Sequence, residues 1–387
     1  MASRRTPSFP CLDGLRVLGA LAIVVTHVSF TAGANFSSRG GAYLARTDAG
    51  VTVFFLLSGF LLYRPFVAAR FAGKAFPRVR TYLWRRAVRI LPAYWVALTV
   101  IAIAGGTHIH GPRDVVLYYG LLQIYSHERV LGGLVQAWSL CTQASFYLFL
   151  PLYAWLLRQT VGSVRVSRRV VGTELAGVVS LYGIGLSFRA LVLLQHPRSA
   201  GEALTWLPAN LDWFALGMGL AVLSARPARA DAMHATRVPA AVWVALAGAT
   251  YWVVATRLGL PRGIESLSTP QAIGRQVLYG LTACFLVVPA VFGSPDVGLV
   301  RRLLGSRLAH AGAAVTYGVY LWHDFWMQKV VGWTHMRLFQ GHFGPLLAAT
   351  LALALATAIV SRVVVERPAL ALREGGVRLP WRRLLPA

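Results

Sequence analysis

Long apolar stretches recur along the chain and are separated by short connections that carry most of the charged residues. A helix needs about 20 apolar residues to cross a bilayer, so this pattern predicts about ten membrane-spanning helices. The expected spans are residues 12–32, 48–67, 90–105, 138–157, 171–194, 206–224, 239–258, 270–293, 308–331 and 344–363. We therefore predict an all-α fold, a polytopic integral membrane bundle in which residues 1–387 form one domain.

The basic connections predict how the bundle is oriented. Arg and Lys concentrate in residues 64–89, 158–169, 226–237 and 301–307 and in the tail after Arg362. Cytoplasmic loops carry an excess of Arg and Lys, and an even number of spans must separate any two of them. We therefore expect the short apolar stretch 115–125 to lie in the interface or to re-enter. Both termini are then cytoplasmic in a multi-pass protein of the cell membrane.

Composition narrows the class of protein further. Hydrophobic residues make up 56% of the chain and charged residues 13%, whereas soluble domains carry about 25% charged residues. This excludes an ordinary soluble enzyme and also a disordered chain. The formal net charge of +25 does not indicate a nucleic-acid partner, because the basic residues fall between apolar runs and form no single basic face. We expect membrane lipids as neighbours instead.

The first expected span carries the ionisable side chains Asp13, Arg16 and His27. At 3.6 residues per turn, Arg16 and His27 fall about 20° apart around the helix and about 16 Å apart along it. Asp13 lies three residues before Arg16, on the same side. Ionisable groups inside a membrane usually face a cavity and carry function, so we predict a functional face with Arg16 at the cytoplasmic rim. The alternative is a helix–helix hydrogen bond for His27 and a lipid-facing Arg16.

The sequence Leu-Asp-Gly-Leu-Arg, ten residues and then His27 resembles the opening of the acyltransferase-3 family of integral membrane acyltransferases. Further stretches are similar to family motifs in the same order: residues 50–60, 85–94, 138–151, 210–218, 317–323 and 366–368. The resemblance implies a ten-helix fold that transfers an acyl group, often from acyl-CoA, to a hydroxyl or amine.

Acyl transfer to a hydroxyl needs a general base and a group that stabilises the oxyanion. His27 is the natural base. Trp138, Tyr147 and Gln143 are candidates for the oxyanion or for substrate contacts. We group Asp13, Arg16 and Gln143 with His27 as catalytic candidates. The spacing of Cys and His indicates no metal site, so acyl-CoA is the expected co-substrate and no metal is expected.

The phosphates of acyl-CoA need cationic partners. Arg85, Arg86 and Arg89 lie at the expected cytoplasmic mouth, and a guanidinium group matches two phosphate oxygens at once. We predict that these three arginines and Arg16 bind the donor. By spacing alone, lipid headgroups would be the favoured partners, and it is the resemblance to the family, in which such an Arg-x-x-Arg pair recurs, that implies binding of the donor.

Three more polar residues lie inside expected spans. His323 and its neighbour Asp324 fall in the ninth span, and Asp212 falls in the sixth. We expect them to position the acceptor, with a purely structural helix–helix hydrogen bond as the alternative for each.

Gln143 departs from the family pattern, which usually has Glu five residues after the Trp. An amide cannot transfer a proton as an acid or a base. Asp13 or Asp324 could replace the missing carboxylate. Otherwise the chain is a member with altered chemistry, or a catalytically impaired member that only binds.

The acceptor is less defined by the sequence. The residues around Gln143 are similar to those of actinobacterial members that acylate macrolide antibiotics, with cell-surface glycans or lipid sugars as the alternative acceptors. A transporter is a different class that ten spans with central polar residues would also fit. The small-residue pairs Gly183/Gly185 and Gly217/Gly219 permit close helix approach, which leaves a homodimer open.

Overall fold

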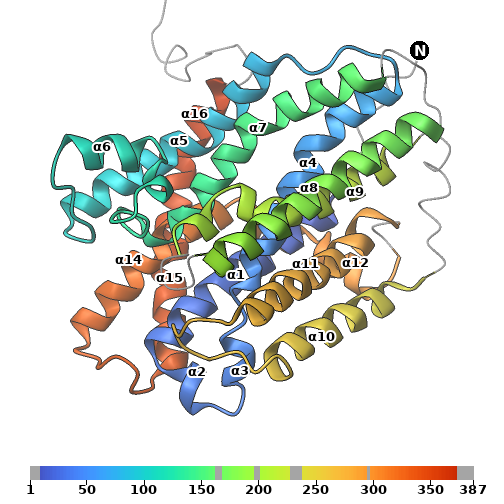
Figure 1. Ribbon diagram of the computed structural model, residues 1–387. Coiled ribbons are helices and arrows are strands. Elements are labelled where there is room, and N and C mark those ends of the chain that lie inside the picture. Colours follow the sequence, from blue (N-terminus) through green and yellow to red (C-terminus); the bar gives the residue numbers. More distant parts are fainter. Residues whose placement is uncertain (1–8, 162–167, 196–200, 227–237, 294–296, 373–387) are drawn as a thin grey trace, which may run out of the picture.

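The computed structural model describes residues 9–161, 168–195, 201–226, 238–293 and 297–372, and every regular element in these ranges is helical. The prediction of an all-α bundle is therefore confirmed (Figure 1). The long helices are α1 (Cys11–Thr31), α4 (Ala49–Phe71), α5 (Val79–Ile103), α7 (Trp138–Val161), α8 (Arg168–Gln195), α9 (Leu211–Ser224), α10 (Ala240–Thr256), α11 (Thr269–Val291), α14 (Thr316–Trp333) and α15 (Phe343–Ser361). Shorter ones are α2 (Ala34–Ser37), α3 (Gly41–Leu44), α6 (Pro112–Tyr119), α12 (Leu299–Leu304), α13 (Arg307–Ala313) and α16 (Arg367–Ala371).

Seven helical stretches of the described chain are long and apolar enough to cross a membrane, judged by length and composition. The other three expected spans correspond to α9, α10 and α14. The helix α9 has 14 residues and α10 has 17, which makes both shorter than a typical span of about 20 residues. The chain is therefore a multi-pass membrane protein. The stretch 115–125 contains only the end of the eight-residue α6 and a 3₁₀ turn, and α6 rises about 12 Å, too little to cross.

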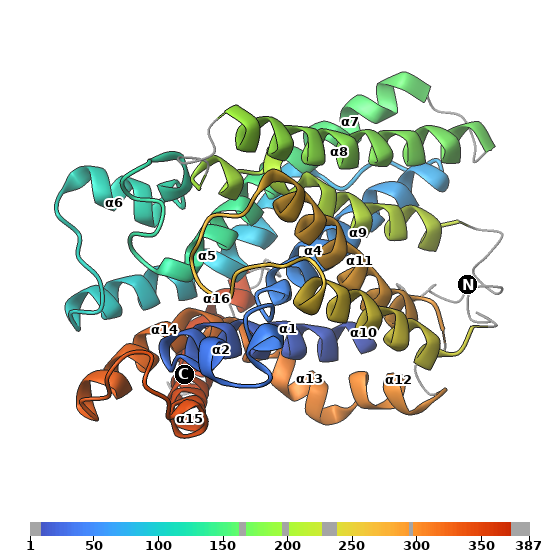
Figure 2. The ribbon, with the colours of Figure 1, turned by 60° about the horizontal axis from the view of Figure 1, so that its bottom comes forward.

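The structure corrects the ninth expected span. Residues 308–331 do not form one helix, because the helix is interrupted between α13 and α14 at residues 314–315. His310 of α13 lies 2.8 Å from Asp13 Oδ2, which ties the short helix to the start of α1. α14 is therefore a separate helix, and it packs beside α1. Figure 2 shows α12 and α13 together along one side of the bundle.

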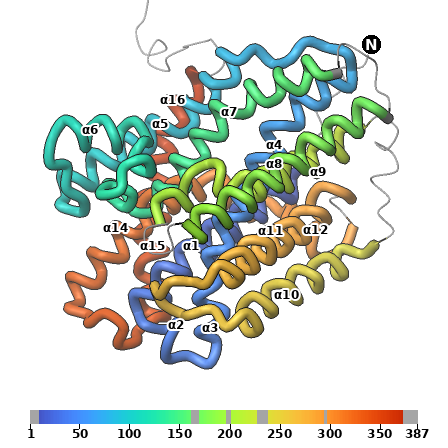
Figure 3. Tube along the Cα trace, viewed as in Figure 1, coloured from blue at the N-terminus to red at the C-terminus, as the bar shows by residue number. Residues whose placement is uncertain are grey.

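The helix α1 lies inside the bundle, in contact with α4, α11, α13, α14 and α15. The tube in Figure 3 shows it passing close to α4 and α11. Such a surrounded helix can direct polar side chains into the protein instead of the lipid. The functional candidates of α1 are therefore positioned by its neighbours.

Glycine permits a close contact between α4 and α9. A Cβ atom on Gly59 would lie 2.1 Å from the carbonyl oxygen of Phe214, and one on Gly217 would lie 1.9 Å from that of Leu56. Each helix thus contributes one glycine to a backbone-to-backbone approach, as in other small-residue membrane interfaces. Gly217 accordingly serves packing within this chain, whereas nothing lies within 4 Å of a Cβ placed on Gly183.

A buried ion pair ties three helices together on the side of α8. Arg70 Nη1 of α4 donates to Glu174 Oε1 of α8 at 2.8 Å, and Arg70 Nη2 donates to the carbonyl oxygen of Leu157 in α7 at 2.8 Å. The hydroxyl of Tyr63 donates to the other oxygen of Glu174. The pair is 6% and 2% exposed, so each charge depends on its partner for stabilisation.

Candidate active site

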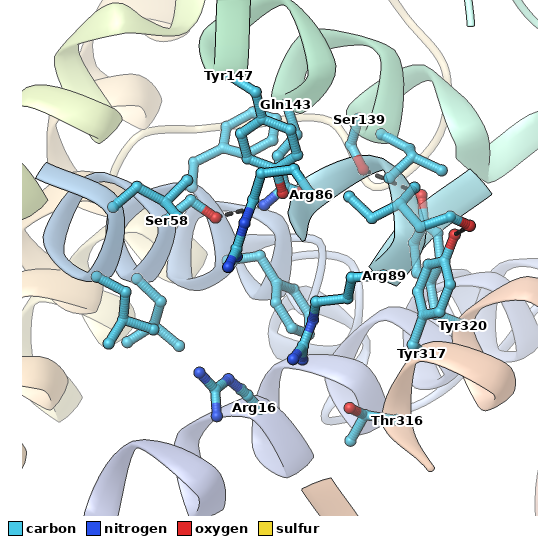
Figure 4. Close-up of a pocket in the computed structure, with 17 residues that line it drawn as sticks. Arg16, Ser58, Arg86, Arg89, Ser139, Gln143, Tyr147, Thr316, Tyr317 and Tyr320 are labelled. Carbon is cyan, nitrogen blue, oxygen red and sulfur yellow. Dashed lines mark hydrogen bonds between the residues drawn. The ribbon is translucent and has the colours of Figure 1, made fainter. Parts of the chain in front are cut away.

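The arginine cavity lies between α1, α4, α5, α7 and α14 and has a volume of about 390 Å³. Arg16 of α1 and Arg86 and Arg89 of α5 line it, and Figure 4 shows their guanidinium groups extending toward one common space. Its other polar lining comes from Ser58, Ser139, Gln143, Tyr147, Thr316, Tyr317 and Tyr320. None of the described lining residues is a carboxylate. The cavity therefore suits a ligand that carries several negative charges.

One contact orients Arg16, and another fixes the backbone beside Arg89. Arg16 forms an ion pair with Asp13, which lies outside the lining. On the other side, the hydroxyl of Tyr317 in α14 donates to the carbonyl oxygen of Ile90 at 2.9 Å, which fixes α5 one residue after Arg89. This hydrogen bond thus holds α5 and α14 together at the arginine cavity.

Arg85, which we expected to bind the same ligand, lies elsewhere. Its side chain is exposed and is not among the described residues that line the arginine cavity. Neighbouring positions on a helix point about 100° apart, so Arg85 and Arg86 face different surroundings. The Arg-x-x-Arg pair Arg86 and Arg89 remains together on the cavity face.

Gln143 also lies in the arginine cavity. Its Nε2 donates to the Ser58 hydroxyl oxygen of α4, and Tyr147 follows one turn later on the same wall (Figure 4). Trp138 packs edge-on against Phe55, with ring centroids 6.3 Å apart, and is not among the described residues that line this cavity. Gln143 is thus placed to contact a ligand, and it is not a hydrogen-bond partner of His27 in the described contacts.

His27 opens into a second space, which we call the histidine cavity. This cavity has a volume of about 310 Å³ and lies toward the end of α1 opposite Arg16. The charged residues in its lining are Arg46, Asp48, Arg262, Arg275 and Asp324, and its other polar residues are Thr26, Thr31 and Asn35. Arg16 and His27 share a helix face as expected, but they line different cavities.

His27 pairs with His323 of α14, which is fully buried. Nδ1 of His27 lies 3.0 Å from Nε2 of His323, and the two rings stack with centroids 5.0 Å apart. The other ring nitrogen of His323, Nδ1, lies 2.8 Å from the carbonyl oxygen of Tyr320. His323 therefore bridges His27 to the backbone of α14.

The two cavities share two chain segments. Ser139 lines the arginine cavity, and Val135, four residues earlier, lines the histidine cavity. On α14, Tyr320 lines the first and Asp324 lines the second. Hydrogen bonds join the segments, because Ser139 Oγ lies 3.0 Å from Tyr320 Oη and Gln136 Nε2 donates to two α14 carbonyls at 3.1 and 2.9 Å. We call these contacts of Gln136, Ser139 and Tyr320 the partition.

Asp212 and Asp324, both expected to position the acceptor, differ in their surroundings. Asp324 faces the histidine cavity and accepts a hydrogen bond from Gln328 at 2.7 Å. Asp212 is fully buried and accepts one from Gln276 of α11 at 2.9 Å, and it lines neither described cavity. Asp212 therefore joins α9 to α11, which is the structural alternative.

Sequence reasoning missed Asp48 and Arg46. Asp48 lies at the edge of a long span, accepts a hydrogen bond from the Tyr279 hydroxyl, and lines the histidine cavity. Arg46 is buried there and donates to the carbonyl oxygen of Pro261. The available signal in the sequence was an acidic and a basic residue directly before an apolar run. The residues that they contact, Tyr279 and Pro261, lie more than 200 positions away along the chain.

Comparison with known proteins identifies the family of the chain. Residues 9–363 match the family described as Acyltransferase domain, the acyltransferase-3 family. Among curated proteins, "Acyltransferase MdmB" of Streptomyces mycarofaciens is 30% identical over 223 residues, which are 54% of this chain and 53% of that protein. "Nodulation protein 10" of Rhizobium leguminosarum bv. viciae is 24% identical over 355 residues, which are 84% and 82% of the two chains.

"Peptidoglycan O-acetyltransferase OatA" of Listeria monocytogenes is 24% identical over 177 residues, which are 42% of this chain and 26% of that protein. The chain thus spans about half of the first of these relatives and about a quarter of OatA. No solved structure matches it. Because the family match covers nearly the whole length of the helical bundle, the chain belongs to the acyltransferase-3 family.

Proposed function

We propose that the chain transfers an acyl group, acetyl or similarly short, from acyl-CoA to a hydroxyl of a small molecule such as a macrolide antibiotic. The observation that carries this proposal is the pair of cavities on either side of the partition. The described lining of the arginine cavity has three guanidinium groups and no carboxylate, whereas that of the histidine cavity has an imidazole, three guanidinium groups and two carboxylates. Membership of the acyltransferase-3 family supports the same reaction.

The arginine cavity is the proposed donor site. Arg16, Arg86 and Arg89 bind the phosphates of acyl-CoA through charge-assisted hydrogen bonds, which are stronger than neutral ones. A volume of about 390 Å³ falls within the range of about 300–1,000 Å³ that ligand sites occupy. The expected cytoplasmic connection 64–89 contains Arg86 and Arg89, and Arg16 lies near the start of α1, so the donor enters from the cytoplasm and both termini face it.

The histidine cavity is the proposed acceptor site. His27 removes the proton from the acceptor hydroxyl, and the oxygen attacks the thioester carbonyl carbon. The tetrahedral oxyanion collapses, the C–S bond breaks, and the thiolate of CoA takes the proton from His27. Asp48 and Asp324 line the same cavity and favour the imidazolium that forms in between, whereas the guanidinium groups of Arg46, Arg262 and Arg275 in that lining oppose it.

The partition is where the two substrates meet. Its residues Ser139 and Tyr320 face the donor cavity, and Tyr320 lies one turn before His323. The Tyr320 hydroxyl donates to the carbonyl oxygen of Gln136 and lies 3.0 Å from Ser139 Oγ. The two hydroxyl groups are candidates to stabilise the oxyanion if they exchange these hydrogen bonds for bonds to the thioester oxygen. Gln143 belongs to the donor side, so an amide there does not disturb the orientation of His27.

O-acylation of a cell-surface glycan or lipid sugar is the second candidate. The match to a peptidoglycan O-acetyltransferase favours it. Membership of the acyltransferase-3 family favours an enzyme over the transporter that the sequence left open, and a transporter would consume no acyl-CoA.

The test is transfer of radiolabelled acetyl from acetyl-CoA in membranes that contain the wild-type chain, offered macrolide and glycan acceptors. We expect labelled acceptor and free CoA in equal amounts. His27→Ala should lower the rate by about 10²–10⁴, the contribution of a general base. His335→Ala is the matched control, because His335 is exposed and lines neither described cavity. Normal transfer by His27→Ala would overturn the assigned role, and no CoA release with any acceptor would favour transport.

A further inference from the structure

We infer that His323 is a positioning residue that sets the tautomer of His27 and thereby makes Nε2 of His27 the atom that receives the acceptor's proton. The inference rests on the proposed acyl transfer for its catalytic meaning. The hydrogen-bond pattern that carries it does not depend on the reaction.

The argument starts at the buried end of the pair. Nδ1 of His323 lies 2.8 Å from the carbonyl oxygen of Tyr320 and 3.2 Å from that of Val319. A carbonyl oxygen only accepts hydrogen bonds, so Nδ1 of His323 carries the proton. His323 is fully buried, which favours the neutral ring with a single N–H. Its Nε2 therefore has a lone pair and no proton.

This lone pair determines the state of His27. Nε2 of His323 lies 3.0 Å from Nδ1 of His27, and only one of the two nitrogens can donate. Because Nε2 of His323 has no proton, Nδ1 of His27 is the donor. The neutral ring of His27 then leaves its own Nε2 unprotonated, as a general base requires. The two backbone carbonyl oxygens of α14 that lie near Nδ1 of His323 thus determine that Nε2 is the basic nitrogen of His27.

The carboxylates nearby do not serve this purpose in the structure. Asp48 accepts from the hydroxyl of Tyr279, and Asp324 accepts from Gln328 at 2.7 Å. Neither forms a hydrogen bond to His27 within the described contacts. In a Ser-His-Asp triad, a carboxylate orients the histidine. Here an uncharged imidazole does so, and the neighbouring carboxylates act only through their charge.

The comparison with the Ser-His-Asp triad also gives the expected loss of kcat when His323 is replaced. Replacing the orienting Asp of a serine protease by its amide lowers the rate about 10⁴-fold, because the histidine takes the wrong tautomer. Since the carboxylates around His27 still stabilise its imidazolium, we expect a smaller loss of about 10²–10³-fold in kcat when His323 cannot accept the hydrogen bond. The KM for acyl-CoA should not change, because the donor site lies across the partition.

Two variants separate positioning from packing. His323→Leu fills the buried space but has no acceptor for Nδ1 of His27. His323→Gln keeps one amide oxygen that accepts and one amide nitrogen that donates to the α14 carbonyl. The direct measurement is the ¹⁵N spectrum of histidine-labelled protein in lipid nanodiscs, with the His27 signals assigned from a His27→Asn sample. Protonated and unprotonated ring nitrogens give well-separated signals.

In the wild-type protein and in His323→Gln, we expect His27 with a proton on Nδ1 and none on Nε2. In His323→Leu, the proton should move wholly or partly to Nε2, with kcat reduced about 10²–10³-fold, while His323→Gln stays within about tenfold of the wild type. A wild-type His27 with its proton on Nε2 would overturn the inference, even if His323→Leu fails to fold. So would an unchanged tautomer in folded His323→Leu. If the tautomers follow expectation but the wild type transfers no acyl group, the proposed function fails and the positioning role stands.

Discussion

Arg85 and Arg86 offer a controlled test of the donor site, because they are neighbours of equal charge on α5. Arg86 is half-buried and points into the arginine cavity, whereas Arg85 is exposed outside it. Changing either to Ala removes one positive charge from the same turn of the same helix. Any effect through the overall charge of this membrane face should therefore be equal for the two variants.

The magnitude follows from the contacts that each residue makes with the donor. A hydrogen bond to a charged group contributes about 1.5–3 kcal/mol, and about 1.4 kcal/mol corresponds to a factor of ten. Arg86→Ala should therefore raise the KM for acetyl-CoA by about 10- to 150-fold and leave kcat within a few-fold. Arg85→Ala should change the KM less than about twofold, as expected for a solvated surface charge.

The assay is the rate of acetyl transfer in nanodiscs, measured over a range of donor concentrations. S-acetylpantetheine serves as a second donor, because it has the thioester and the pantetheine arm but no phosphate. The two variants should use this truncated donor as well as the wild type does. Equal KM changes in Arg85→Ala and Arg86→Ala would refute the assignment of the cavity. So would an Arg86→Ala defect that persists with S-acetylpantetheine.

Three further predictions concern other parts of the molecule. Gln143→Glu places a carboxylate in the arginine cavity, so it should raise the KM for acetyl-CoA without raising kcat; a kcat gain of about 100-fold or more would instead show that the chemistry needs the family carboxylate. Glu174→Ala leaves the buried Arg70 guanidinium without its counter-charge and should lower the free energy of unfolding by about 3–5 kcal/mol. The measurement is the thermal unfolding temperature in detergent, and an unchanged temperature would contradict the buried ion pair. Gly217→Ala should force α9 away from Leu56 and lower stability by at least about 1–3 kcal/mol in the same assay, whereas Gly183→Ala should be neutral; equal effects would argue against the α4–α9 contact.

The hydrophobic pattern was sufficient to predict the helical fold and most helix positions. Apolar runs long enough for a bilayer form helices because backbone groups in lipid must bond within their own segment. The sequence also placed Asp13 beside Arg16, since residues three apart on a helix are neighbours. The prediction failed at 308–331, where the helix is interrupted between α13 and α14. Beside the interruption, His310 contacts Asp13, a residue 297 positions away, and a pattern within one segment does not encode such a contact.

Only the tertiary structure decided what the polar residues contact. The sequence determined that Arg16 and His27 share a face of α1, but the packing of α5, α7 and α14 divides that face between two cavities. In the same way, helix periodicity places His323 inside a span but does not say which helix it meets. His27 and His323 are 296 residues apart, and they come together because α1 and α14 pack side by side. Local backbone geometry sets the direction of a side chain, whereas its partner depends on long-range packing, which no periodic pattern within one segment encodes.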